Sequence, residues 1–280
     1  MNSGTFTTAG LSLAAAAVWG GGDFAGGLAA KRASVFRVVA IAHAFGLLLM
    51  VLLTWAAGEH MPPPVALLWG AATGVTGGFG IAALYKGLSI GQMGIVAPVA
   101  SVITAVLPVV YGFVIEGIPG QVERLGLALA VISIWLITRS DGKSGSREGL
   151  GLAVIAGLMF GLFLICGKEA GRYAVLWPLV SARVASTLLM FTIVLVSPRD
   201  PQPLRPALLP ILLSGTFDSL ANALYIAATR FGRLDVAAVL SSLYPASTVI
   251  LARVILKEKF SRTQVLGIVG ALVAVALISA

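Results

Sequence analysis

The chain is a succession of long apolar runs separated by short clusters of charged residues and proline. A bilayer core about 30 Å thick requires about 20 apolar residues per helix. A window of that length finds apolar segments at residues 9–30, 36–57, 65–85, 92–115, 121–138, 148–168, 177–197, 207–229, 234–256 and 262–279. The pattern predicts an all-α membrane protein with ten transmembrane helices and little chain left for a water-soluble domain.

The second half of the chain repeats the first in order. Ala-Leu-Tyr at residues 83–85 recurs at 223–225, and Trp19 is matched by Phe160. The offsets are 140 and 141 residues. Any single pair in so Gly- and Ala-rich a chain carries little weight, but an ordered series of pairs indicates an internal duplication.

We therefore expect a first five-helix repeat over residues 9–138, a connecting loop at 139–147 and a second repeat over 148–279. Because five is an odd number, the second repeat enters the membrane from the opposite side. Inverted repeats of this kind are a recurring plan of secondary transporters, which bind substrate near the bilayer midplane between the halves.

Composition excludes the soluble classes of protein. Apolar residues make up 58% of the chain and charged residues 11%, where soluble domains have about 25% charged residues. So few charges cannot cover a soluble surface, so we exclude a soluble enzyme, a secreted scaffold and a disordered chain. Residues 1–22 contain no Lys or Arg, so the first run lacks the basic start of a cleaved signal and is expected to be a retained span.

The net charge of +8 indicates orientation and not a nucleic-acid partner, because the basic residues are scattered between apolar runs. The odd-numbered loops hold Lys31, Arg32, Arg37, Lys86, Arg139, Lys143, Arg147, Arg199, Arg205, Arg253, Lys257, Lys259 and Arg262. The even-numbered loops hold Arg124, Lys168, Arg172, Arg230 and Arg233. Because cytoplasmic loops carry the excess of Lys and Arg, we expect the odd loops in the cytoplasm and both termini outside.

Several short motifs in residues 223–267 have a familiar order. They are an Ala-Leu-Tyr helix end, a Ser-Leu-Tyr-Pro-Ala stretch, a Lys-Glu-Lys corner and a Gln-x-x-Gly final helix. The first half echoes them with residues 83–101 and Glu116, and residues 17–20 (Ala-Val-Trp-Gly) form a matching opening. In these motifs the chain resembles the EamA-type family of the drug/metabolite transporter superfamily.

The resemblance implies ten helices in two inverted halves and export or import of amino acids, metabolites or drugs. It also implies a central cavity walled by spans one, three, four, six, eight and nine. The better-known members are often drawn with both termini in the cytoplasm, which disagrees with the orientation that the loop charges predict.

Ionisable residues within the predicted spans are functional candidates, because a charged group at membrane depth costs several kcal/mol on most scales. Asp23, His43, Arg183 and Asp218 lie inside spans. If transport is coupled to protons, we expect Asp218 to carry the proton, with Asp23 and His43 as the alternatives. The other interpretations are a static pairing of the carboxylates with Arg183 or Asn222, a packing role for His43 and an interfacial position for Arg183.

Helical spacing groups further polar and aromatic residues with these carboxylates. Asp218, Asn222 and Tyr225 are spaced i, i+4 and i+7 and so share one stripe of their helix. The predicted substrate contacts are Trp19, Asp23, Ser101, Phe217, Asp218, Asn222, Tyr225, Ser241, Tyr244 and Thr248. The hydroxyl groups among them have an alternative role, which is to bond the carbonyl one turn earlier in their own helix.

These patterns favour a secondary transporter in a bacterial-type inner membrane, with a small amino acid, sugar or drug-like solute as its partner. We expect a monomer or a homodimer in the lipid bilayer, with no cofactor, no metal and no catalytic residues, since no nucleotide-binding, metal or hydrolase motif occurs in a usable context. Two alternatives stay open. One is a membrane-embedded lipid-modifying enzyme with Asp218 and His43 as acid and base, and the other is a passive channel.

Overall fold

The computed structural model describes residues 3–30, 32–90, 93–138, 149–197, 202–244, 246–247, 251 and 262–279, and every regular element in these ranges is helical. The first half contains α1 (Ser3–Ala30), α2 (Val35–Ala57), α3 (Pro64–Ile90), α4 (Met93–Ile115) and α5 (Gln121–Thr138). The second half contains α6 (Leu150–Gly171), α7 (Leu176–Val196), the 3-10 turn η1 (Arg205–Ala207), α8 (Leu208–Thr229), α9 (Leu234–Ser241) and α11 (Arg262–Ser279).

The boundary between α2 and α3 shows how the sequence ends one helix and begins the next. Gly58 follows α2 in the left-handed region, with φ of 61°, and its N–H donates to the carbonyl oxygen of Trp55 at 3.2 Å. Glycine adopts this conformation without the steric penalty of a side chain. Pro64 opens α3, where a missing N–H is not needed by the helix and the fixed φ favours the first turn.

The outer surface of the bundle is apolar, as expected for contact with lipid. Five helical segments in the described residues are long and apolar enough to cross a membrane: Val35–Ala57, Pro64–Gly87, Leu150–Gly171, Leu176–Val196 and Arg205–Thr229. Large apolar side chains such as Trp55, Leu195 and Val114 are more than three-quarters exposed. The interior instead buries charged groups such as Arg183 and Glu169. The chain is an integral, multi-pass membrane protein.

One predicted span differs from the structure. The apolar run at residues 234–256 predicts a continuous helix, but α9 ends at Ser241 and a turn follows at Ser242 and Leu243. This turn directly precedes the helical residue Tyr244, which is followed by Pro245, and a proline disfavours an uninterrupted helix through the residues before it. Residues 248–250 and 252–261 lie outside the described ranges.

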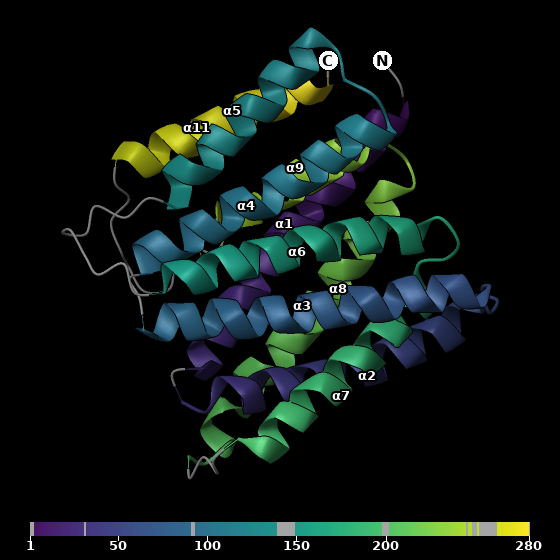
Figure 1. The fold of residues 1–280 in the computed structure, drawn as a ribbon, viewed down its shortest axis with the longest axis vertical. Coiled ribbons are helices and arrows are strands. Elements are labelled where there is room, and N and C mark those ends of the chain that lie inside the picture. The colour runs from purple at the N-terminus through teal and green to yellow at the C-terminus, as the bar shows by residue number, and fades with distance from the viewer. Residues whose placement is uncertain are drawn as a thin grey trace.

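The helices lie side by side with their long axes running across the view in Figure 1. The α5–α11 pair forms one edge of the bundle and the α2–α7 pair forms the other, with the remaining helices between them (Figure 1). The pairing has an internal symmetry. Helix α1 packs on α8 as α6 packs on α3, and α2 packs on α8 as α7 packs on α3. Exchanging the two halves therefore leaves these neighbours unchanged.

The same symmetry holds at the level of single residues. A Cβ atom added to Gly74 of α3 would collide with the carbonyl group of Ala182 in α7. A Cβ atom added to Gly215 of α8 would collide in the same way with the carbonyl group of Ala42 in α2. The two contacts differ by 141 and 140 residues in sequence, which is the offset of the repeated motifs.

Corresponding helices begin at opposite faces of the bundle. Thr8, near the start of α1, donates to the carbonyl oxygen of Ala228 near the end of α8, at 3.2 Å. Lys168, near the end of α6, donates at 3.2 Å to the carbonyl oxygen of Gly232, which follows α8. Helix α1 therefore begins at the face where α6 ends. We call this the Glu116 face, and we call the opposite face, at the end of α1, the Arg32 face.

Candidate functional site

A central cavity lies where the two halves meet. It contains about 730 Å³ of space not filled by atoms, counting the open space at its mouth. Its lining comes from α1, α2, α3, α4, α6, α7, α8, α9 and the turn after α9. The expected wall omitted spans two and seven, and the structure corrects this, because α2 contributes His43 and α7 contributes Ala182, Arg183 and Ser186.

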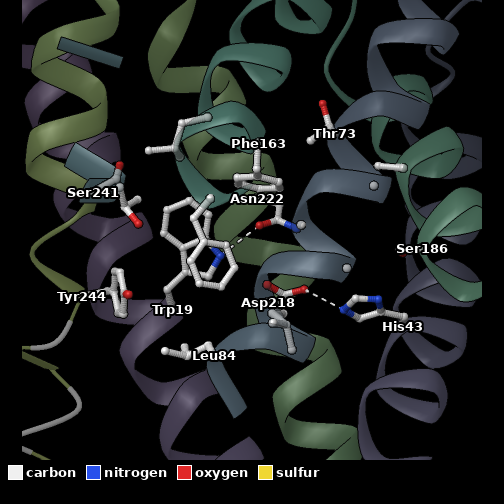
Figure 2. A pocket seen from close by; sticks show the side chains of 18 of the residues that line it. Trp19, His43, Thr73, Leu84, Phe163, Ser186, Asp218, Asn222, Ser241 and Tyr244 are labelled. Carbon is white, nitrogen blue, oxygen red and sulfur yellow. Dashed lines mark hydrogen bonds and ion pairs between the residues drawn. The ribbon is translucent and has the colours of Figure 1, made fainter. Parts of the chain in front are cut away.

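An aromatic group forms the centre of the cavity. Trp19 of α1 is fixed by its indole N–H, which donates to the side-chain oxygen of Asn222 in α8 at 2.9 Å. Its ring centroid lies 6.0 Å from that of Phe163 in an edge-on arrangement and 5.8 Å from that of Tyr225. Figure 2 shows Trp19 between Tyr244 on one side and Asp218 with His43 on the other. The indole is therefore a rigid wall shared by both halves.

A charged group lies on the other side of Trp19. The guanidinium of Arg183 in α7 donates to the carboxylate of Asp218 in α8, and the two form an ion pair. Nε2 of His43 lies 4.0 Å from the same carboxylate oxygen (Figure 2). Arg183 and His43 are each only 4% exposed. Because both charges of the Arg183–Asp218 pair have a partner, the pair avoids most of the cost of a lone charge at this depth.

Asp23 differs from Asp218 in its surroundings among the described residues. It lies one helical turn beyond Trp19 in α1 and lines the same cavity. It makes no hydrogen bond or ion pair with the residues that the structure describes. It does interact electrostatically with Asp218, Tyr85 and Tyr244. An acidic group with two acceptor oxygens is thus left open to whatever occupies the cavity.

Hydroxyl groups line the part of the cavity near the end of α9. Ser241 ends α9, Ser242 lies in the turn that interrupts the predicted span, and Tyr244 directly follows this turn. The hydroxyl of Ser101 in α4 donates to the hydroxyl oxygen of Tyr244 at 3.3 Å. The interruption of α9 therefore positions three polar side chains at the cavity wall, and α4 orients one of them.

The structure brings together most of the residues that the sequence predicts as substrate contacts. Those that line the cavity are Trp19, Asp23, Asp218, Asn222, Ser241 and Tyr244, and the proton-coupling candidate His43 lies among them. Thr248 lies outside the described residues. Substrate contact itself stays a prediction for all of them.

Three predicted contacts lie outside this lining. Tyr225 is fully buried beneath Trp19, and its hydroxyl donates to the carbonyl oxygen of Leu164 at 2.7 Å. Phe217 packs against Gly21 of α1, since it precedes Asp218 by one residue and so points about 100° away around the helix. Ser101 is fully buried behind Tyr244. Helical spacing correctly predicts which residues share a face of the helix. It does not predict how far along that face the cavity extends.

Some lining residues escaped the sequence prediction. Arg183 and Ser186 of α7 and Phe163 of α6 are examples. The sequence did mark Arg183 as a functional candidate, because it is an ionisable residue within a span. Its interpretation as an interfacial side chain is wrong, since it forms a buried ion pair with Asp218. Gly74 and Gly78 of α3 pack against α7 and also line the cavity.

The cavity is sealed toward the Glu116 face. A layer of fully buried side chains from α1, α8 and α9 comes first, including Ala15, Tyr225 and Leu234. An ionic layer lies beyond it. The carboxylate of Glu116 in the first half accepts from Nζ of Lys168 at 2.7 Å and from the backbone N–H of Leu234 at 2.9 Å, both in the second half.

A second carboxylate joins the halves at the same face. Glu59, between α2 and α3, accepts hydrogen bonds from the backbone N–H groups of Val175, Leu176 and Trp177 at 2.9–3.0 Å. These groups belong to the start of α7, where the helix dipole favours a negative charge. Both acidic residues therefore cap helices of the opposite half.

Comparison with known proteins supports this description. A model of the EamA-like transporter family matches the chain twice, at residues 7–139 and 147–280. No curated protein matches the chain. A solved structure described only as "Crystal structure of protein" aligns with a TM-score of 0.78 at 15% sequence identity, covering 99% of this chain and 96% of its own. At that identity the likeness shows the fold alone.

Proposed function

The chain belongs to the EamA-like transporter family, whose members are transporters and not enzymes, and on this premise we propose that it moves a small metabolite across the membrane by alternating access. The observation that carries the proposal is the cavity between the halves, which is lined by both halves and sealed toward one face. A transporter of this type binds its solute at such an interface and exposes it to one side at a time.

We also propose that the full chain crosses the membrane ten times as two inverted five-helix repeats. The repeated helix pairings, the matched contacts at Gly74 and Gly215 and the opposite directions of α1 and α6 support this arrangement. In the proposed cycle the halves rock against each other about the bound solute. The ionic contacts of Glu116 hold one face closed and break when that face opens.

Proton coupling is part of the proposal, with Asp218 as the first candidate and Asp23 and His43 as the others. It rests on carboxylates and an imidazole at membrane depth around one cavity. The test is Asp218→Asn in proteoliposomes, which we expect to change the pH dependence of transport. Unchanged transport with unchanged pH dependence would exclude Asp218 as the proton carrier.

The direct test of transport is solute counterflow. Purified protein in proteoliposomes is loaded with an unlabelled solute that it binds, and uptake of the same labelled solute is followed. Alternating access predicts uptake that saturates and is accelerated by solute on the far side of the membrane. Electrical conductance without counterflow would instead identify a passive channel.

The enzyme alternative retains one specific observation. His43 and Asp218 do lie in one cavity, with Nε2 and Oδ2 4.0 Å apart. The family match weighs against the enzyme, because the members of this family are transporters. Chemical conversion of a phospholipid by the purified protein, without translocation of any solute, would favour the enzyme over the transporter.

A further inference from the structure

The charges around the cavity do not balance. Arg183 is the one basic residue in the described lining apart from His43, and its charge is matched by Asp218. Asp23 adds a second carboxyl group for which the described residues supply no partner. An unpaired carboxylate at membrane depth is costly, so Asp23 either takes up a proton or pairs with an occupant that supplies a positive charge, and a cationic solute can replace the proton.

The lining offers no comparable site for a negatively charged solute. The guanidinium of Arg183 is 4% exposed and its charge is already matched by Asp218, so a carboxylate or phosphate would have to compete with Asp218 for it. A neutral solute would leave Asp23 without an ionic partner. The charges of the cavity wall therefore favour a cationic solute over a neutral one and a neutral solute over an anionic one.

The geometry also specifies what the positive charge is attached to. Trp19 and Asp23 are spaced i and i+4 in α1, so their side chains lie on the same face about one turn apart. A cation held by Asp23 is therefore within reach of the indole ring, where cation–π attraction adds to the ion pair. Phe160, Phe163 and Leu84 complete an apolar wall beside this position.

We infer that the solute is an amphipathic organic cation, whose ammonium group binds Asp23 and whose apolar or aromatic body packs against Trp19 and Phe163. This inference rests on the proposed transport function and specifies its substrate class. Asp218 and Arg183 remain paired when the solute binds and do not contact its charge.

The experiment measures binding of three probes of similar size and different charge to the purified full chain in nanodiscs by calorimetry. The probes are 2-phenylethylamine, which is a cation at neutral pH, 2-phenylethanol, which is neutral, and 3-phenylpropionate, which is an anion. We expect the amine to bind at least tenfold more tightly than the alcohol and the propionate not to bind. Equal binding of the alcohol, tighter binding of the propionate or no binding of the amine would overturn the inference.

Variants of Asp23 identify the residue responsible. We expect Asp23→Asn to weaken binding of the amine at least tenfold while leaving the weak binding of the alcohol unchanged, and Asp23→Glu to retain most of the amine affinity. Glu123→Gln is the matched control, because it removes a carboxyl group from α5, a helix that contributes no residue to the described lining. Equal loss in both amide variants would contradict a specific role for Asp23. If Asp23→Asn does not fold, the three probes on the wild-type protein still decide the inference.

Counterflow separates this inference from the proposed transport function. If the amine binds through Asp23 but is not exchanged across proteoliposomes, the cation site stands and the transport proposal fails. If a neutral or anionic solute shows counterflow while the amine neither binds nor competes, transport stands and the cation inference fails.

Discussion

In the proposed cycle the ion pair between Glu116 and Lys168 holds the Glu116 face closed, and its removal tests that cycle most directly. In Lys168→Gln the charged contact of 2.7 Å with Glu116 is lost, together with the weaker bond to the carbonyl oxygen of Gly232. Glu116 keeps its bond from the backbone N–H of Leu234, so the helix start of α9 remains capped. The expected result is an easier opening of this face without loss of the fold.

The magnitude follows from the burial of the two side chains. Lys168 is 12% exposed and Glu116 20% exposed, so the pair lies between two limiting cases. Exposed pairs contribute about 0–1 kcal/mol, and breaking a buried pair costs about 3–5 kcal/mol. A loss of about 1.5 kcal/mol is intermediate and corresponds to roughly a tenfold increase in the ratio of open to closed protein.

Cys166 supplies the assay, because it is the single cysteine of the chain and is buried in α6 two residues before Lys168. When opening is rare and fast, the rate of alkylation by a membrane-impermeant maleimide is proportional to the open fraction. We expect Lys168→Gln to be alkylated about tenfold faster than the wild type, as followed by mass spectrometry of the protein in nanodiscs. Arg32→Gln is the matched control, because Arg32 bonds the carbonyl oxygen of Pro206 at the opposite face.

A double-mutant cycle completes this test. Because Lys168 and Glu116 act through one contact, we expect the double variant Glu116→Gln/Lys168→Gln to be alkylated no faster than the faster single variant. Wild-type alkylation in a folded Lys168→Gln protein would refute the assignment of this pair as the closing contact. Equal acceleration in Arg32→Gln would show a general loosening of the protein and refute it as well.

Three further predictions concern packing, capping and orientation. Gly74→Ala forces a methyl group against the carbonyl of Ala182, so we expect a loss of about 1–3 kcal/mol and a lower thermal midpoint in detergent, whereas Gly27→Ala, which meets open space, does not lower the midpoint. Glu59→Gln removes the charge that caps α7 while keeping one acceptor oxygen, and we expect a loss of about 1 kcal/mol in the same melting assay; an unchanged midpoint contradicts the capping role. Tags at the two termini should react with impermeant reagents added outside whole cells, and protection of both tags until lysis would reverse the predicted orientation.

Hydropathy predicts the helices of this fold well, because lipid imposes a length and an apolar composition on each segment. The predicted run at 177–197 agrees with α7 at Leu176–Val196 to within one residue. The run at 9–30 misses the first turns of α1, which begins at Ser3. These turns carry hydroxyl residues that apolar windows reject, and Thr8 is satisfied by the carbonyl oxygen of Ala228 in a neighbouring helix. A hydropathy window covers only residues that are neighbours in sequence, so it does not detect a hydrogen-bond partner on another helix.

The site is harder to predict from the sequence. Whether a residue lines the cavity depends on its depth along the helix and on the side chains that neighbouring helices place beside it. The spacing of Asp218, Asn222 and Tyr225 correctly places them on one stripe, but Asn222 holds Trp19 at the cavity while Tyr225 lies buried beneath the same ring. Pairing of a carboxylate with Arg183 was one interpretation of the sequence, and the structure shows that this carboxylate belongs to Asp218 and not to Asp23. The sequence could not distinguish the two, because the choice depends on how α1, α7 and α8 pack together.

The fold is symmetric between the halves, but the chemistry of the cavity is not. The glycine contact at Gly74 recurs at Gly215, which indicates that the packing of the duplicated halves has been kept. Asp218 has no acidic counterpart in the first half, since the position 140 residues before it is Gly78. A symmetric scaffold gives each face an equivalent way to close, while different side chains set how firmly each face is held. Substitutions at the Glu116 and Arg32 faces are therefore expected to shift the same equilibrium in opposite directions, which unrelated contacts at the two faces would not do.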